Sequence, residues 1–183
     1  MHRIMIIRHA EKHHGNHHHG VSIEGERKKH ELTVLGWQRA GALVRFFAPG
    51  DGVPSGAGIS TPQSIFASAA TPKSPSLRAR RTVEPLAAKL GIQVDDSHPE
   101  GHESKIAIAA LEAASPVLIA WHHSHIPELA EKIAGEHLGW PDEWPDDRFD
   151  VVWILDRPDA NKGRWTFTQV TQRLFAHDRP EPI

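Results

Sequence analysis

The chain has 183 residues, of which 39% are hydrophobic, and a formal net charge of −2 with neutral histidines. Its length suits one sizeable hydrophobic core, so we expect residues 1–183 to form a single domain. Lysine and arginine are scattered along the chain, which argues against nucleic acids and membranes as partners. The lack of cysteine excludes disulfide bonds, thiolate zinc sites and a cysteine nucleophile.

We expect no export signal in the amino-terminal segment. Its apolar run is four residues long, whereas the apolar core of a signal peptide spans about 7–15 residues. No stretch of the sequence approaches the length of about 18 apolar residues that indicates a membrane helix. We therefore expect a cytoplasmic protein that is not inserted in a membrane; the sequence indicates no oligomeric state.

The first predicted strand, residues 4–7, ends directly in Arg8 and His9. Ligands of α/β sheets bind at the carboxyl ends of strands, so we expect both side chains at a binding crevice. A neutral imidazole is a nucleophile near neutral pH, and a guanidinium can bind phosphate through two donors. The pair predicts a phosphoryl acceptor; the alternative from these two residues alone is an arginine paired with a surface carboxylate beside an uninvolved histidine.

A histidine-rich segment follows at residues 13–20, interrupted by two glycines. It has no periodicity, which predicts an irregular loop over the crevice that could act as a lid. Imidazoles bind zinc, copper or nickel, but a metal site needs fixed geometry and supporting partners. We therefore expect a solvated loop and no metal.

The remaining chain alternates predicted helices and strands. A helix capped by Thr33 should stop at Pro49-Gly50, and Gly91 should end the helix at 76–90. Ser124 is expected to cap the last helix, with Gly139 beyond its end. The other predicted helix is 103–114, and the later strands are 64–68, 92–94, 116–121, 151–155 and 165–174, the last alternating like an antiparallel edge. This pattern predicts a three-layer α/β/α sandwich with a mostly parallel sheet.

Two of these apolar strands run directly into histidine, at His9 and at His122-His123. A helix containing Arg78 follows another strand. Because the carboxyl ends of parallel strands meet at one edge of the sheet, we expect two imidazoles and a second guanidinium to converge on one anion.

These residues resemble the histidine phosphatase superfamily, which also contains the cofactor-dependent phosphoglycerate mutases. The family's Arg-His-Gly/Ala opening is similar to Arg8-His9-Ala10. Its Leu-Thr-x-x-Gly-x-x-Gln/Arg-Ala helix resembles residues 32–40, its Ser-x-x-Arg-Ala-x-x-Thr motif resembles residues 75–82, and its late strand followed by histidine resembles residues 117–123. The likeness extends from Ile4 to about residue 133.

The resemblance implies a phosphoglycerate mutase-like fold and a metal-independent phosphatase that acts without cofactor through a phosphohistidine. The substrate would be a small phosphorylated metabolite or a phosphorylated side chain of a protein. By position, His9 is the nucleophile, and Arg8 and Arg78 bind the phosphoryl oxygens together with a second histidine. Two alternatives remain: a phosphoglycerate mutase-type phosphotransferase, and a non-catalytic phosphate- or metal-binding module.

The second histidine and the proton donor have more than one candidate. Alignment of Ile126 with the family's usual hydrophobic position favours His122 as the second histidine. A subgroup with the pattern Trp-Gln-His-x-x-Ile-Pro favours His123, which we predict. The leaving oxygen of an ester needs a proton; Glu100 is the predicted donor and Glu103 the alternative. If no acid is present, substrates with a good leaving group are favoured.

Overall fold

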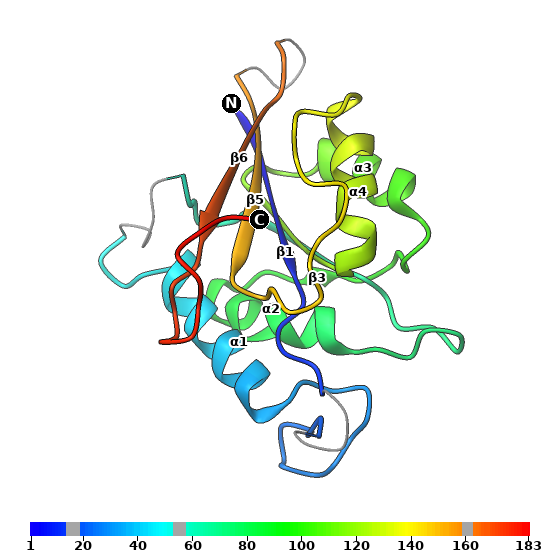
Figure 1. Ribbon diagram of the computed structural model, residues 1–183, viewed down its shortest axis with the longest axis vertical. Helices are drawn as coiled ribbons and strands as arrows, with labels where there is room; N and C mark the ends of the chain where they lie inside the picture. Colours follow the sequence, from blue (N-terminus) through cyan, green and yellow to red (C-terminus); the bar gives the residue numbers. More distant parts are fainter. Residues whose placement is uncertain (14–18, 53–57, 159–162) are drawn as a thin grey trace.

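The structure is a computed structural model and describes residues 1–13, 19–52, 58–158 and 163–183 (Figure 1). Its elements are the strands β1 (His2–Arg8), β2 (Ser64–Ala67), β3 (Val94–Asp95), β4 (Val117–Trp121), β5 (Val151–Arg157) and β6 (Thr166–Thr171), and the helices α1 (Val34–Phe47), α2 (Arg78–Leu90), α3 (Glu103–Glu112) and α4 (Ile126–Ala134), with a 3-10 turn at His123–His125.

The strands form one sheet in the order β3-β2-β4-β1-β5-β6. Strands β1, β4, β2 and β3 pair in parallel, whereas β5 runs antiparallel to both of its neighbours, β1 and β6. The mostly parallel sheet is therefore confirmed, and so is the antiparallel edge strand that alternation predicted near residue 165.

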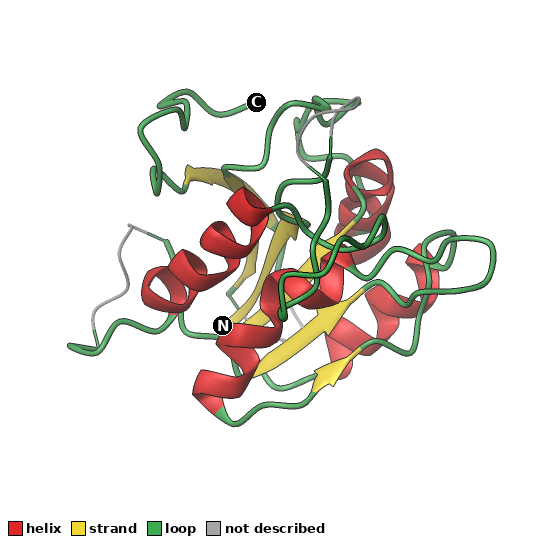
Figure 2. Ribbon diagram, turned by 90° about the horizontal axis from the view of Figure 1, so that it is seen from below, coloured by secondary structure: helices red, strands yellow, loops and turns green. Residues whose placement is uncertain are grey.

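The side chains of β1 pack alternately on the two faces of the sheet. Ile4 and Ile6 join the core formed with α3 and α4, while Met5 and Ile7 join the core formed with α1 and α2. Figures 1 and 2 show these helix pairs on opposite sides of the strands. A strand covered on both faces has to be apolar at every position, which explains the uninterrupted run in the sequence. The three-layer α/β/α sandwich is confirmed.

Most predicted helix ends are confirmed. The Thr33 hydroxyl accepts a hydrogen bond from the Gly36 N–H and caps α1. Gly91, at φ 68°, ends α2 in the left-handed conformation. The N–H of Ile92 donates to the Ala87 carbonyl and so completes the end of this helix, which explains why β3 begins later than predicted.

The predicted boundaries of α4 are wrong. Ser124 does not cap it; this residue lies in the 3-10 turn, and the helix begins at Ile126. Pro127 fits the first turn, where no N–H is needed. The helix ends at Gly135, four residues before the predicted Gly139, because Gly135 takes the left-handed conformation at φ 77° and its N–H donates to Glu131.

The pairing of β1 with β4 brings the two histidine segments together. Arg8 lies opposite Trp121 in the parallel register, and the N–H of His9 continues the ladder to the Trp121 carbonyl at 3.2 Å. The next residues, His9 and His122, therefore leave the sheet side by side. The predicted lid and the metal-binding alternative at 13–20 depend mainly on residues 14–18, which lie outside the described residues. Among the described parts of the chain, no helix combines the length and apolar character needed to cross a membrane.

Candidate active site

The His9 imidazole is fully buried at the carboxyl end of β1. Its Nδ1 lies 2.8 Å from the Ala10 carbonyl oxygen. A carbonyl oxygen can only accept a hydrogen bond, so Nδ1 carries the proton and Nε2 keeps its lone pair. Nε2 is buried and has no hydrogen-bond partner. The lone pair of Nε2 is therefore not used by any hydrogen bond.

Electrostatics keep this imidazole neutral. Burial lowers the pKa of His9 well below 6.5, and the positive charges of Arg8 and Arg78 lower it further, against the hydrogen bond to Ala10. The nucleophilic form therefore persists at slightly acidic pH, where an exposed histidine would be protonated.

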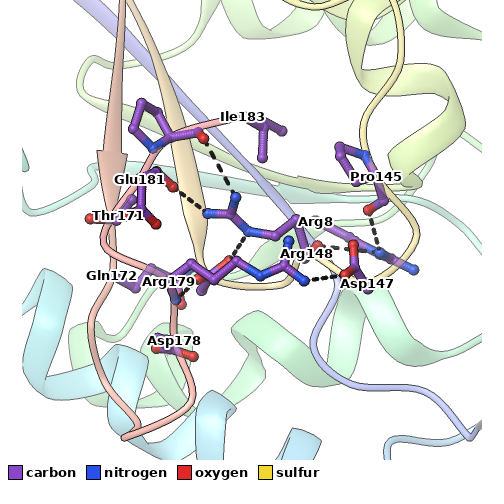
Figure 3. Close-up of polar contacts among 12 residues, drawn as sticks. Arg8, Pro145, Asp147, Arg148, Thr171, Gln172, Asp178, Arg179, Glu181 and Ile183 are labelled. Carbon is purple, nitrogen blue, oxygen red and sulfur yellow. Dashed lines mark hydrogen bonds and ion pairs between the residues drawn. The ribbon is translucent and has the colours of Figure 1, made fainter.

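Arg8 is 1% exposed and lies over the Phe149 ring, with Cζ 3.9 Å from the ring centroid. Its Nη1 donates to three main-chain carbonyls of the segment before β5, those of Pro145, Asp146 and Arg148 (Figure 3). Its Nη2 donates to the Asp146 carboxylate, while Nε is buried without a hydrogen-bond partner. The alternative considered from the sequence, an arginine paired with a surface carboxylate, is thus present as Arg8 and Asp146. It lies beside the buried imidazole of His9.

Arg78 begins α2 and is held against the segment before α1. It donates to the carbonyls of Lys29 and Glu31. Thr82 links this helix turn to β1, because its hydroxyl donates to the Arg78 carbonyl and accepts from the Ala10 N–H, both at 2.7 Å. The Thr82 hydroxyl therefore links the main chain at Arg78 to the residue that follows His9.

Thr82→Val should lower the free energy of unfolding by about 1–3 kcal/mol, because valine leaves the buried Ala10 N–H without an acceptor. The measurement is urea unfolding followed by circular dichroism. Thr82→Ser, which keeps the hydroxyl, should lose less stability than the valine variant. Equal midpoints for wild type and Thr82→Val would show that this link does not stabilise the fold.

His122 lies beside His9, and Glu100 lies beside His122. The rings of His9 and His122 meet edge to face, with centroids 5.3 Å apart. His122 Nε2 lies 3.4 Å from Glu100 Oε2. Burial lowers the pKa of His122, and the Glu100 carboxylate opposes this shift. Only the His122 imidazole separates Glu100 from His9. A carboxylate at this position is suited to exchange protons with a group bound beside His9.

His123 lies one residue further along, and its ring stacks on His122 at 6.0 Å between centroids. Its Nε2 is 3.4 Å from Asp146 Oδ1. Lys12 Nζ donates to the same oxygen at 2.9 Å. His122 therefore contacts the nucleophile, whereas His123 contacts the Asp146 carboxylate beside Arg8. Both histidines that the sequence offered lie at this site.

Glu103 lies outside this group. Its side chain accepts hydrogen bonds from the Trp121 indole and the Gly101 N–H, and its Oε1 lies 3.2 Å from Nδ1 of His125. With 3% of its surface exposed, it fastens the start of α3 to β4. Of the two carboxylates considered from the sequence, Glu100 lies next to His122, whereas Glu103 lies next to His125.

Two hollows border the site. A cavity of about 790 Å³ reaches it through Lys12 and Phe149 and has apolar walls at Val21, Val34 and Leu35. A second pocket, of about 480 Å³, is lined by residues 71–74 and 99–100, including Glu100. Either volume can accommodate the organic part of a small metabolite.

Stability should fall when the pH drops from 7 to 5. Burial lowers the pKa values of His9, His122 and His123, that of His123 to about 4. Unfolded histidines have a pKa of about 6.5, so below that pH the unfolded chain binds protons that the folded chain does not. The midpoint of urea unfolding should decrease over this window, and His123→Asn should reduce the decrease. A midpoint that is constant or rises would contradict these directions.

Thr82 and Asp146 were not among the predicted site residues. Thr82 closes the Ser-x-x-Arg-Ala-x-x-Thr motif, so its spacing from Arg78 offered a signal. Lys12 follows His9 by three residues, which indicates that it lies near the site but not that it contacts Asp146. Asp146 lies in a segment without regular structure, and no pattern in the sequence indicated that it approaches Arg8.

The chain has the fold of solved phosphatase structures. A mycobacterial glucosyl-3-phosphoglycerate phosphatase in complex with VO3 is similar, with a TM-score of 0.55 and 16% sequence identity over 91% of this chain and 97% of that chain. A putative alpha-ribazole-5'-P phosphatase from Escherichia coli K-12 has a TM-score of 0.50 and 13% identity over 93% of this chain and 96% of that chain. No family model and no curated protein matches the sequence.

Proposed function

We propose that the chain is a metal-independent phosphatase that transfers a phosphoryl group to His9 and then to water. The observation that carries this proposal is the state of His9, whose Nδ1–H is anchored to a carbonyl while its neutral Nε2 is buried without a partner. A buried polar nitrogen without a partner is costly. Its retention next to Arg8 and His122 is expected where a nucleophile has to be kept ready.

The reaction has two balanced steps. His9 Nε2 attacks phosphorus, the bond from phosphorus to the leaving oxygen breaks, and Glu100 donates a proton to that oxygen. In the second step the Glu100 carboxylate takes a proton from water, the water oxygen attacks phosphorus, and the P–N bond breaks. Arg8 and Arg78 supply positive charge to the phosphoryl oxygens, where the transition state is most negative, and the neutral His122–His123 pair supplies N–H donors.

The substrate class that we propose is a small phosphorylated metabolite. The two hollows beside the site have the volume for it. The similar structures are those of a glucosyl-3-phosphoglycerate phosphatase and a putative alpha-ribazole-5'-P phosphatase, which supports a phosphate ester here without identifying it. A phosphorylated protein is the alternative substrate. We further propose that residues 1–183 act as one domain, because a single sheet includes strands from both halves of the chain. A cytoplasmic location stays a prediction.

The test is release of phosphate from p-nitrophenyl phosphate by the purified protein, with and without EDTA. We expect turnover that EDTA does not change. Activity that is lost in EDTA and restored by a divalent cation would contradict the metal-independent mechanism.

Two parallel measurements separate the alternatives. Isomerisation of a three-carbon phosphoglycerate at a rate above its hydrolysis would favour a mutase. Calorimetric binding of inorganic phosphate without any turnover would favour a non-catalytic binding module.

A further inference from the structure

A carboxylate of the chain itself lies within a cluster of two cations and one imidazole at this site. Asp146 Oδ1 lies 3.0 Å from Arg8 Nη2, 2.9 Å from Lys12 Nζ and 3.4 Å from His123 Nε2. Arg8 and His123 are two of the groups assigned above to the phosphoryl oxygens. One anion therefore already contacts the donors that the substrate's anion needs.

The nucleophile is also closed off in this arrangement. His9 has no exposed surface, and its Nε2 contacts no hydrogen-bond donor. Phosphorus has to approach this nitrogen to within about 3–3.5 Å before attack. Some neighbouring group therefore has to move before a phosphoryl group can enter.

The Asp146 side chain is well suited to move. It is 59% exposed, whereas the Arg8 side chain that it contacts is fully buried. The main chain around it is anchored independently, because Arg148 donates to Asp150 and to the Glu181 carbonyl of the carboxyl-terminal segment (Figure 3). The carboxylate can therefore rotate into solvent while the main-chain carbonyls at 145–148 continue to hold Arg8.

We propose that the Asp146 carboxylate occupies the position of a phosphoryl oxygen against Arg8 and His123 and is displaced when substrate binds. The proposal rests on the proposed function, since both concern the same site. A phosphoryl group carries more negative charge and more acceptor oxygens than a carboxylate, so the same donors bind it more strongly and the exchange can proceed.

Asp146 is an anion at neutral pH, as competition with a phosphoryl group requires. Burial raises the pKa of Asp146, but the hydrogen bond from Lys12 and the charges of Lys12 and Arg8 outweigh this effect and lower the pKa to about 2. The side chain is therefore ionised under all ordinary assay conditions.

The exchange has a consequence for selectivity. Every phosphate-containing ligand has to compete with Asp146, which weakens the binding of free phosphate. A substrate with an organic part that fills one of the neighbouring hollows gains further contacts and offsets this competition. The carboxylate therefore favours complete substrates over inorganic phosphate and assists release of the product.

Calorimetric titration with inorganic phosphate tests the exchange on wild-type protein, Asp146→Ala and Asp146→Asn. A competitor that occupies about 90% of the sites weakens apparent binding about tenfold. We therefore expect Asp146→Ala to bind phosphate about tenfold more tightly than wild type. Asp146→Asn, which loses the charge but keeps one acceptor oxygen, should lie between them. Asp142→Asn is the matched control, because Asp142 is in the same segment and 99% exposed, and its phosphate affinity should equal that of wild type.

Equal or weaker phosphate binding by both Asp146 variants would overturn the proposal and make Asp146 a residue that organises the cluster. Phosphate binding by none of the proteins would overturn it as well. Thermal unfolding of each variant verifies that it is folded, and Asp146→Asn alone decides the question if the alanine variant is not. Turnover of p-nitrophenyl phosphate is measured separately. Tighter phosphate binding by the Asp146 variants without turnover in any protein counts against the proposed phosphatase only. Turnover with phosphate binding unchanged in the Asp146 variants counts against the exchange only.

Discussion

His9→Ala should lower kcat for p-nitrophenyl phosphate by about 10⁴-fold or more, because it removes the atom that forms the covalent intermediate. The remaining donors, Arg8 and Arg78, can still hold a phosphoryl group, so phosphate binding should survive in this variant. Steady-state kinetics and phosphate calorimetry on the same preparation measure the two properties. Loss of turnover with retained phosphate binding assigns His9 to chemistry rather than to the structure of the pocket.

His137→Ala is the control for this experiment. His137 is a partly exposed imidazole that lies 3.8 Å from the Asp142 carboxylate, away from the described site. It should keep wild-type kcat. If His9→Ala retains turnover within about tenfold of wild type, nucleophilic catalysis by this residue is wrong, because loss of a covalent nucleophile cannot leave so much activity.

Glu100→Gln should have an effect that depends on the leaving group. An alkoxide leaves poorly without a proton, so kcat/KM for an alkyl phosphate should fall by about 10²–10⁴-fold. Nitrophenolate leaves without protonation, so its release from p-nitrophenyl phosphate should be affected much less in the first step. The measurement is kcat/KM for both substrates with wild type and Glu100→Gln, together with a burst analysis that separates the two steps.

Glu103→Gln provides the comparison, since Glu103 was the alternative donor. Its carboxylate is buried against Trp121 and the 3-10 turn. Glutamine keeps an acceptor for the indole but loses the charge next to His125, so stability should decrease while the leaving-group dependence stays as in wild type. A loss of equal size for both substrates in Glu100→Gln would instead indicate that Glu100 positions His122.

The sequence predicted the parts of the site that depend on the sheet. Arg8 and His9 stand at the end of an uninterrupted apolar strand, and the strand before His122 has the same character. The parallel pairing of these strands follows from the alternation of helices and strands, so the meeting of His9 with a second histidine could be predicted. The reversed direction of β5 could not, because an apolar run does not indicate strand direction.

Other features depend on packing between distant segments. Whether His122 or His123 contacts His9 is decided by the 3-10 turn at His123–His125, which no periodicity indicated. The choice between Glu100 and Glu103 depends on the start of α3, where Glu103 is turned toward Trp121. The contact of Asp146 with Arg8 depends on the path of an irregular segment that is far from Arg8 in the sequence and is anchored by Arg148.

Trapping the covalent intermediate tests the central claim most directly. Wild-type protein mixed with ³²P-labelled substrate and quenched in alkali should carry label that is stable in base, released by acid and mapped by mass spectrometry to the peptide containing His9. The label should be absent from His9→Ala. Label on any other residue, or rapid turnover with no labelled protein at any quench time, would contradict attack by His9 Nε2.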